Sequence, residues 1–139
     1  MSGLAYLHSQ HIAHRSIKGA NLLVDSCGVV KLADFGMAQQ LSGQEGGHIC
    51  VEGKSILAII YGRHSLLASD IWSLGCTVIE VLTGRPPWSQ HASVQEASFK
   101  IASGQDTPQF PETLSSEGKN FLRCCLQRNL LIGQLLPCY

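Results

Sequence analysis

The sequence predicts a mainly α-helical fold with one small β-hairpin near its N-terminal end. Three observations predict this class: a long apolar segment at 69–82, two later segments with apolar residues at helical spacing, and two short β-rich runs early in the chain. The chain has 139 residues, which is one domain's worth and enough to bury a core.

The predicted N-terminal elements are a short helix and the hairpin. In the first ten residues, apolar positions are spaced by three and four as far as His11, as in the last turns of a helix. Asn21–Asp25 and Val29–Ala33 are β-rich, and the sequence Ser26-Cys27-Gly28 between them is typical of a turn. These runs predict two strands joined as a hairpin.

Three helices are expected after a long loop at 36–55, which contains five glycines. In Ser69–Leu82 the apolar side chains cover nearly the whole circumference, so we expect a central helix that is buried on all sides. The segment Thr83–Pro87 ends it. Apolar spacing predicts two more amphipathic helices, one from Val94 to Ala102 and one from Leu114 to Leu126.

The charge composition excludes some classes of partner. Ten Lys+Arg balance ten Asp+Glu, so no basic field favours nucleic acid or an anionic membrane. The longest apolar run, 56–61, is too short to cross a bilayer, no signal peptide is visible, and the six cysteines form no C-x-x-C pair. We therefore expect a soluble cytoplasmic protein with reduced thiols. The low charged fraction of 14% predicts poor solubility or a surface that a partner covers.

Two short segments carry residues suited to phosphoryl transfer. They are His14-Arg15-Ser16-Ile17-Lys18-Gly19-Ala20-Asn21 and, directly after the second predicted strand, Asp34-Phe35-Gly36. Asn21 and Asp34 flank the hairpin, so their oxygens could converge on Mg²⁺, and Lys18 could neutralise a transferred phosphate. Each residue alone is a weak signal, but their order around a hairpin is highly specific.

The first segment resembles the protein-kinase catalytic loop, H-R-D-x-K-x-x-N, and the second resembles the metal-binding D-F-G. Further segments resemble mitogen-activated protein kinase kinase kinases, especially those of plants: Tyr6-Leu7-His8, Lys18–Asn21, Asp70–Thr77 and Arg85–Trp88. The resemblance covers residues 1–129 and implies the C-terminal lobe of a protein-kinase domain, with the N-terminal lobe absent. Residues 130–139 are expected to form a divergent tail.

The resemblance implies a role for each matching residue. Asn21 and Asp34 match the two magnesium-binding positions, Lys18 matches the lysine that contacts the γ-phosphate, and Leu23 matches the residue beneath the adenine, so ATP and Mg²⁺ are the implied cofactors. Structural and regulatory positions are matched by His14 and Phe35 (hydrophobic spine), Arg15 (partner of a phosphorylated activation loop), Gly36 (last residue of D-F-G) and Asp70 (holder of the catalytic-loop backbone).

The departure that decides the function is Ser16, which stands where the family has its catalytic aspartate. A serine hydroxyl has no carboxylate charge to accept the substrate proton near neutral pH. We favour the interpretation that Ser16 is a small polar residue closing a turn over a rescued catalytic role. Without an N-terminal lobe, the chain would contact only one side of ATP. We therefore expect a severe loss of affinity for ATP and no stable metal site without nucleotide.

Two other segments of the family pattern are missing. After Gly53-Lys54-Ser55 the chain runs through 56–67 into the central helix without an A-P-E segment, and 130–139 does not continue the R-P-T-A-like segment. Three functions stay open. The chain is a serine/threonine kinase with at most vestigial transfer to a MAP kinase kinase, a non-catalytic pseudokinase-like module that binds a full-length kinase or its substrate, or a poorly folded truncation product. For the chain itself we favour the second function, the non-catalytic module. By family, we assign the chain to the protein kinases.

Overall fold

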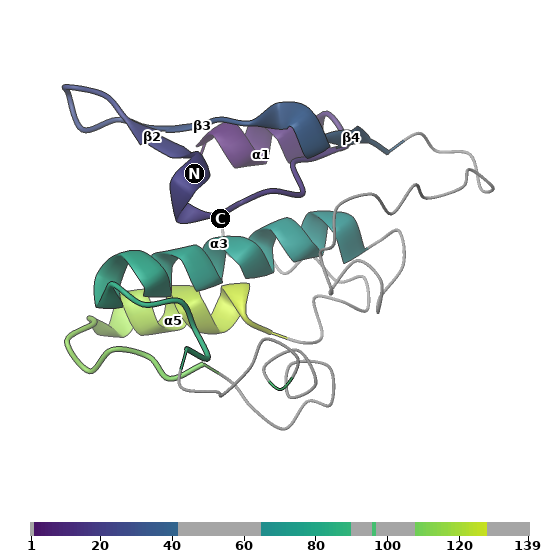
Figure 1. The fold of residues 1–139 in the computed structure, drawn as a ribbon. Coiled ribbons are helices and arrows are strands. Elements are labelled where there is room, and N and C mark those ends of the chain that lie inside the picture. The colour runs from purple at the N-terminus through teal and green to yellow at the C-terminus, as the bar shows by residue number, and fades with distance from the viewer. Residues whose placement is uncertain (1, 42–64, 90–95, 97–107, 128–139) are drawn as a thin grey trace.

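The computed structural model of the chain describes residues 2–41, 65–89, 96 and 108–127. Within these ranges the chain forms two layers, with the N-terminal elements in one and two long helices in the other (Figure 1). The elements in order are α1 (Ser2–Ser9), β1 (Ile12–Ala13), the 3-10 helix η1 (Gly19–Asn21), β2 (Leu22–Val24), β3 (Val30–Leu32), the 3-10 helix η2 (Phe35–Met37), β4 (Gln39–Gln40), α3 (Ser65–Thr83) and α5 (Ser116–Cys125).

The N-terminal layer begins with α1, which confirms the short helix predicted within the first ten residues. His11 follows it with a φ of 55°, in the left-handed region. The chain then enters β1, which pairs antiparallel with β4 in the register Ile12↔Gln40 and Ala13↔Gln39. β4 and most of η2 lie within the segment 36–55 predicted as loop, and residues 42–55 lie outside the described residues.

The predicted hairpin is confirmed, because β2 and β3 pair antiparallel with Val24 opposite Val30. Its turn is held by Asp25, whose Oδ1 accepts hydrogen bonds from the backbone N–H groups of Cys27 (2.9 Å) and Val29 (3.0 Å). Gly28 has a φ of +78°, which a residue without a Cβ adopts at no steric cost. The Val29 N–H, and then Lys31 at 3.2 Å from Oδ2, hold the pKa of Asp25 below its ordinary value.

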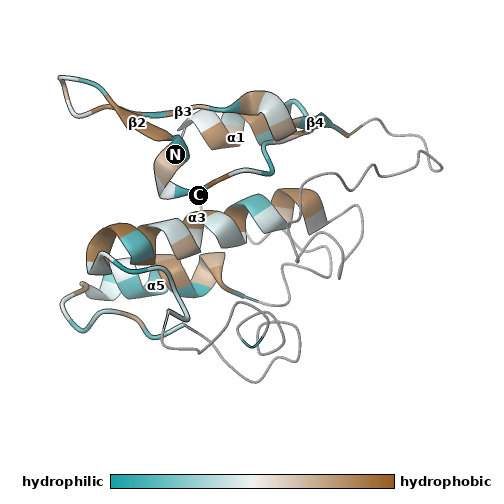
Figure 2. Cartoon of the chain, viewed as in Figure 1, coloured by the Kyte–Doolittle hydropathy of each residue, from teal (hydrophilic) through white to brown (hydrophobic). Residues whose placement is uncertain are grey.

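Helix α3 begins four residues earlier than predicted and ends as predicted. Gly84, with a φ of +70°, terminates it, and its N–H donates to the Glu80 carbonyl. The side chains of Val81 and Leu82 are 70% and 51% exposed, so burial on all sides is wrong for the last turn, although Figure 2 colours much of α3 brown for its apolar residues. Apolar character alone therefore did not indicate burial at this end of α3.

The apolar length of α3 also meets a test for membrane spans. Residues Leu66–Thr83 have a mean hydropathy of 1.4, enough by length and composition to cross a bilayer. Such a helix is equally typical of a protein core. Here α3 packs against α5 and carries the buried Asp70, and these contacts account for its composition.

Helix α5 confirms the third predicted helix within its bounds. The Ser115 Oγ accepts a hydrogen bond from the Gly118 N–H at 3.1 Å, which caps the helix start. The second predicted helix, 94–102, lies outside the described residues except for Glu96, which is helical.

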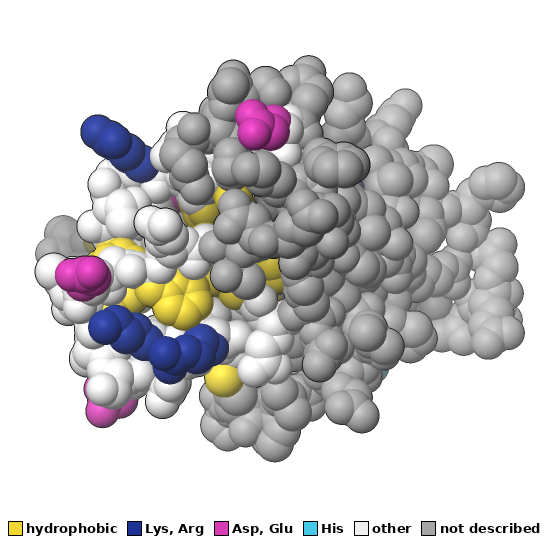
Figure 3. All heavy atoms as spheres, turned by 90° about the horizontal axis from the view of Figure 1, so that it is seen from below, with side chains coloured by type: hydrophobic (Ala, Val, Ile, Leu, Met, Phe, Trp, Pro, Cys, Tyr) yellow, Lys and Arg dark blue, Asp and Glu magenta, His cyan; other side chains and the backbone are white. Residues whose placement is uncertain are grey.

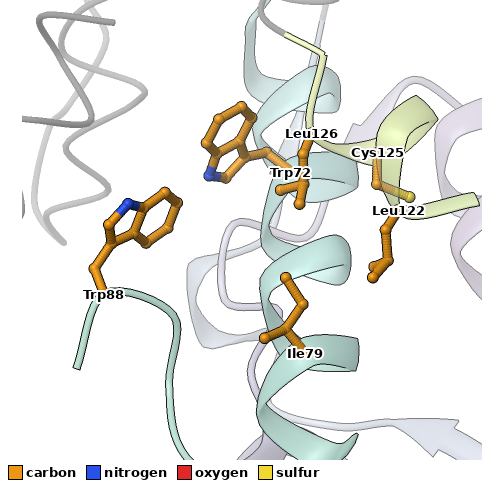
Figure 4. Close-up of a cluster of buried hydrophobic side chains, with 6 residues drawn as sticks. All are labelled: Trp72, Ile79, Trp88, Leu122, Cys125 and Leu126. Carbon is orange, nitrogen blue, oxygen red and sulfur yellow. The ribbon is translucent and has the colours of Figure 1, made fainter. Parts of the chain in front are cut away.

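The core lies at the seam between α3 and α5 (Figure 4). It consists of Trp72, Ile79, Trp88, Leu122, Cys125 and Leu126, and the rings of the two tryptophans stack with centroids 6.2 Å apart. The helices approach closely at Gly75, where an added Cβ would lie 2.8 Å from the Cys125 Cβ. Burial, followed by the nearby Cys125, raises the pKa of the Cys76 thiol to about 12, so this thiol stays neutral.

The surface below this helix pair mixes both signs of charge. Figure 3 shows apolar side chains bordered by Lys or Arg and by separate acidic groups. The described part of this face therefore presents no broad field of one sign, as the balanced charge count predicts.

Candidate functional site

The site is built where the N-terminal layer meets α3, and its anchor is Asp70. The Asp70 side chain is 1% exposed, and it accepts hydrogen bonds from the backbone N–H groups of His14 and Arg15, both at 2.7 Å. The Nε2 atom of His8 lies 3.1 Å from the same carboxylate. Arg15 has a φ of 65°, and this left-handed turn presents both N–H groups to one side chain. Asp70 thus ties the loop 14–21 to the central helix.

His14 connects this loop to the segment that carries Asp34. Its ring is fully buried, and its Nδ1 lies 3.3 Å from the backbone N–H of Ser16, which is a donor. Nδ1 must therefore accept, and Nε2 must carry the proton that it donates to the Ala33 carbonyl at 3.1 Å. Phe35 packs edge-on against the same ring, with centroids 4.9 Å apart, although half of the Phe35 side chain is exposed.

Asn21, Ser16 and Asp34 meet at the base of the hairpin. The Asn21 Nδ2 donates to the Ser16 carbonyl (2.8 Å) and to the Ser16 Oγ (2.9 Å), and lies 3.4 Å from the Asp34 Oδ2. Asp34 itself has a φ of 62°, and its Oδ1 accepts from the Gly36 N–H at 3.4 Å. The structure therefore brings together the two residues expected to bind magnesium, together with the serine at the family's aspartate position.

Two residues expected to bind the nucleotide lie open to solvent. Lys18 precedes η1 and is exposed, with no ion-pair partner among the described residues. Leu23 lies on β2 opposite Lys31 and is 57% exposed.

Arg15 directs its guanidinium away from this cluster, toward β4. Its Nη1 donates to the Gln39 Oε1 at 2.9 Å, and its buried Nε has no hydrogen-bond partner within the described ranges. The guanidinium therefore retains donor capacity, although Gln39 occupies one of its N–H groups.

Sequence reasoning missed two partners in this network. His8 was noted only as part of a motif, and its contact with Asp70 crosses 62 residues. Gln39 had no signal, because its contact with Arg15 depends on the β1–β4 pairing.

The donor set fits Mg²⁺ when phosphates complete it. Asn21 and Asp34 supply an amide oxygen and a carboxylate, the hard oxygen ligands that Mg²⁺ takes together with waters and substrate phosphates. No group of three or more His, Cys, Asp or Glu side chains within the described residues could hold an ion by itself. The expected dependence of the metal on nucleotide is consistent with this set and stays a prediction.

Comparisons with known proteins identify the family. The model of the protein kinase domain matches residues 1–130. The chain is 50% identical to mitogen-activated protein kinase kinase kinase 5 and 51% identical to the kinase kinase kinase YODA, both of Arabidopsis thaliana, over 93% of the chain in each case. It is 41% identical to human mitogen-activated protein kinase kinase kinase 3 over 88% of the chain.

These matches cover a small part of each relative. The chain spans 19% of the first Arabidopsis protein, 15% of the second and 20% of the human one. The loop 14–21, the triplet 34–36 and the central helix all fall inside the matched range. Because the family model matches nearly the whole chain, this chain belongs to the protein kinase family.

Proposed function

We propose that this chain is the C-terminal-lobe part of a serine/threonine kinase domain of the kinase kinase kinase type, covering 1–129, in which phosphoryl transfer is lost and Mg²⁺-nucleotide binding is retained at the low affinity expected of an uncovered site. The observation that carries this proposal is the cluster of Ser16, Asn21 and Asp34. Two metal-binding side chains lie within hydrogen-bond distance there, while the third position has a hydroxyl in place of a carboxylate.

The roles follow from the chemistry of each group. The oxygens of Asn21 and Asp34 would hold Mg²⁺, which when bound neutralises the phosphates of ATP, and Lys18 would contact the γ-phosphate. Leu23 offers an apolar surface to the adenine. Ser16 cannot take the proton of an attacking hydroxyl near pH 7, so the step that needs a base is not assisted.

The partner and location follow from the same proposal. The relatives are named as kinases of mitogen-activated protein kinase kinases, and we assign a protein of that class as the partner of this chain. The free thiols of Cys27 and Cys76 support a reducing, cytoplasmic location.

A second candidate function is a non-catalytic interaction module for a full-length kinase. The observation that favours it is the exposed apolar surface beside the site, formed by Leu23, Val24, Val29, Val30 and Phe35, each more than half exposed. Apolar surface of this kind is typical of a contact region.

The deciding experiment is a thermal melt of the full chain with ATP, with and without Mg²⁺. We expect Mg²⁺-dependent stabilisation of about 1.4 kcal/mol at a ligand concentration of ten times Kd, and its loss in Asp34→Asn. The matched control, Asp25→Asn, makes the same chemical change at the hairpin turn and should keep the stabilisation.

A radiometric assay with a generic serine/threonine protein substrate completes the test. Incorporation of phosphate should equal that of buffer. Incorporation that Asp34→Asn abolishes would contradict the loss of transfer. A chain that ATP and Mg²⁺ fail to stabilise would contradict retained nucleotide binding and leave the interaction module.

A further inference from the structure

We propose that Ser16 is a positioning residue, whose hydroxyl orients the Asn21 amide so that its oxygen stays available to a divalent cation shared with Asp34. This inference rests on the proposed function and gives Ser16 a role there. The substitution at this position removes a proton acceptor while it retains a hydrogen-bond acceptor. The site would thereby keep cation binding after losing phosphoryl transfer.

The contacts of Asn21 carry the proposal. Its side chain is buried, with 7% exposure, and its amide nitrogen carries two hydrogens. Three oxygens surround this nitrogen: the Ser16 carbonyl at 2.8 Å, the Ser16 Oγ at 2.9 Å and the Asp34 Oδ2 at 3.4 Å. The two shortest contacts belong to Ser16, and the hydroxyl supplies one of them.

The Ser16 carbonyl and the Asp34 carboxylate decide which end of the amide faces Ser16. If the amide flipped, its carbonyl oxygen would face the Ser16 carbonyl, with no hydrogen between them, and would come close to the Asp34 carboxylate. The hydroxyl, which can donate or accept, serves as a second acceptor that holds the nitrogen in this orientation. All three contacts use the nitrogen, so none of them occupies the Asn21 Oδ1. That oxygen is therefore free to bind a hard cation.

The charge of the cluster shows how position 16 can accept a hydrogen bond without acting as a proton acceptor. A hydroxyl is neutral, so among the three side chains that meet here only Asp34 contributes a carboxylate. A cation held by one carboxylate and one amide oxygen needs phosphate oxygens to complete its shell. Ser16 can therefore maintain the geometry of a nucleotide-dependent cation site without acting as a base.

The test uses Mn²⁺ as the probe and electron paramagnetic resonance of the full chain in the presence of ADP. Ser16→Ala removes the Oγ acceptor, and loss of such an outer contact typically weakens metal affinity about tenfold. Ser16→Thr keeps an equivalent oxygen and should restore the affinity. Ser26→Ala, at the exposed hairpin turn, is the matched control and should bind Mn²⁺ as the unaltered chain does.

Each outcome bears on the proposal. Equal Mn²⁺ affinity in Ser16→Ala and the unaltered chain would overturn the role of Ser16 and leave the proposed function standing. Absence of ADP-dependent Mn²⁺ binding in the unaltered chain would overturn both. Loss of affinity in Ser16→Ala that Ser16→Thr fails to restore would also overturn the role.

A second measurement needs no variant and therefore does not depend on whether Ser16→Ala folds. In the unaltered chain without ligand, the Asn21 side-chain amide protons should exchange with water more slowly than those of the exposed Asn120, because two short hydrogen bonds hold them. Exchange at the same rate as Asn120 would overturn the proposal.

Discussion

The core of the α3–α5 pair buries large apolar side chains such as Trp72, Ile79 and Leu122, whereas in the β2–β3 hairpin Leu23, Val24 and Val30 are each more than half exposed. The helix pair is held by tertiary packing. The hairpin is held by the local hydrogen bonds of Asp25 and by strand pairing. The site lies between these regions and is tied to the helix pair through Asp70. Its geometry should therefore depend on the helices far more than on the hairpin surface.

The substitution with the largest expected effect removes the side chain that connects the two regions. Asp70→Ala leaves the backbone N–H groups of His14 and Arg15 buried without an acceptor, and it should lower the free energy of unfolding by about 3–5 kcal/mol. Urea unfolding measures this loss. Asp70→Asn keeps one acceptor oxygen, so it should cost less. Equal losses for the two variants would contradict the anchoring role.

The next effect compares the two regions directly. Leu122, which is fully buried, should lose about 3 kcal/mol of stability on substitution by alanine, since the change removes buried methyl groups and leaves a cavity. Val30→Ala on the hairpin should cost less than about 1 kcal/mol, because that side chain is mostly exposed. The same urea experiment checks both. Similar losses would show that the hairpin surface is covered in solution.

A smaller effect tests the closeness of α3 and α5. Gly75→Ala places a methyl group 2.8 Å from the Cys125 Cβ, and the overpacking should cost about 1–3 kcal/mol. Gly118→Ala is the control, because its methyl group would meet the flexible end of Leu114 at 2.9 Å. Thermal melts of the two variants should therefore separate. A Gly75→Ala variant as stable as Gly118→Ala would contradict the close approach.

The smallest expected effect is the pH dependence of the hairpin. The pKa of Asp25 is lowered in the folded chain, so its contribution to stability is present above the unfolded pKa of about 3.9 and is lost as pH falls through the folded pKa. An NMR titration of the Asp25 carboxyl measures the shift. Lys31→Met should raise the pKa only in part, because the Val29 N–H is the larger cause. A complete return to the ordinary value would contradict that order.

Helix α5 and the hairpin could be predicted from local patterns alone. The apolar spacing from Leu114 to Leu126 predicted the helix, and a turn sequence between two β-rich runs predicted the hairpin. The start of α3 could not be predicted. Ser69 and Asp70 are residue types typical of a helix N-terminus and favoured a start at Ser69, but the Asp70 side chain accepts from the distant loop, and the helix begins at Ser65.

The identities of the site residues could be predicted from the sequence, but the contacts between them could not. The motifs located Asn21, Asp34 and Asp70, because their identities and order are specific. The hydrogen bonds from Asn21 to the Ser16 hydroxyl and from Arg15 to Gln39 depend on how the loop folds back, and no local pattern encodes that path. The left-handed φ angle of Arg15, whose N–H donates to the distant Asp70, is likewise not indicated by any local pattern.

Helix α3 carries both Asp70 and Gly75, and their spacing fixes a phase relation. Five residues correspond to about 140° of rotation and about 7.5 Å of rise. Asp70, which binds the loop, and Gly75, which contacts α5, therefore lie on nearly opposite sides of α3. Inserting or deleting one residue between them would turn one side by about 100° relative to the other. The helix could then keep the contact of Asp70 with the loop or the contact of Gly75 with α5, but not both. The spacing between these two residues is therefore a constraint on length as well as on composition.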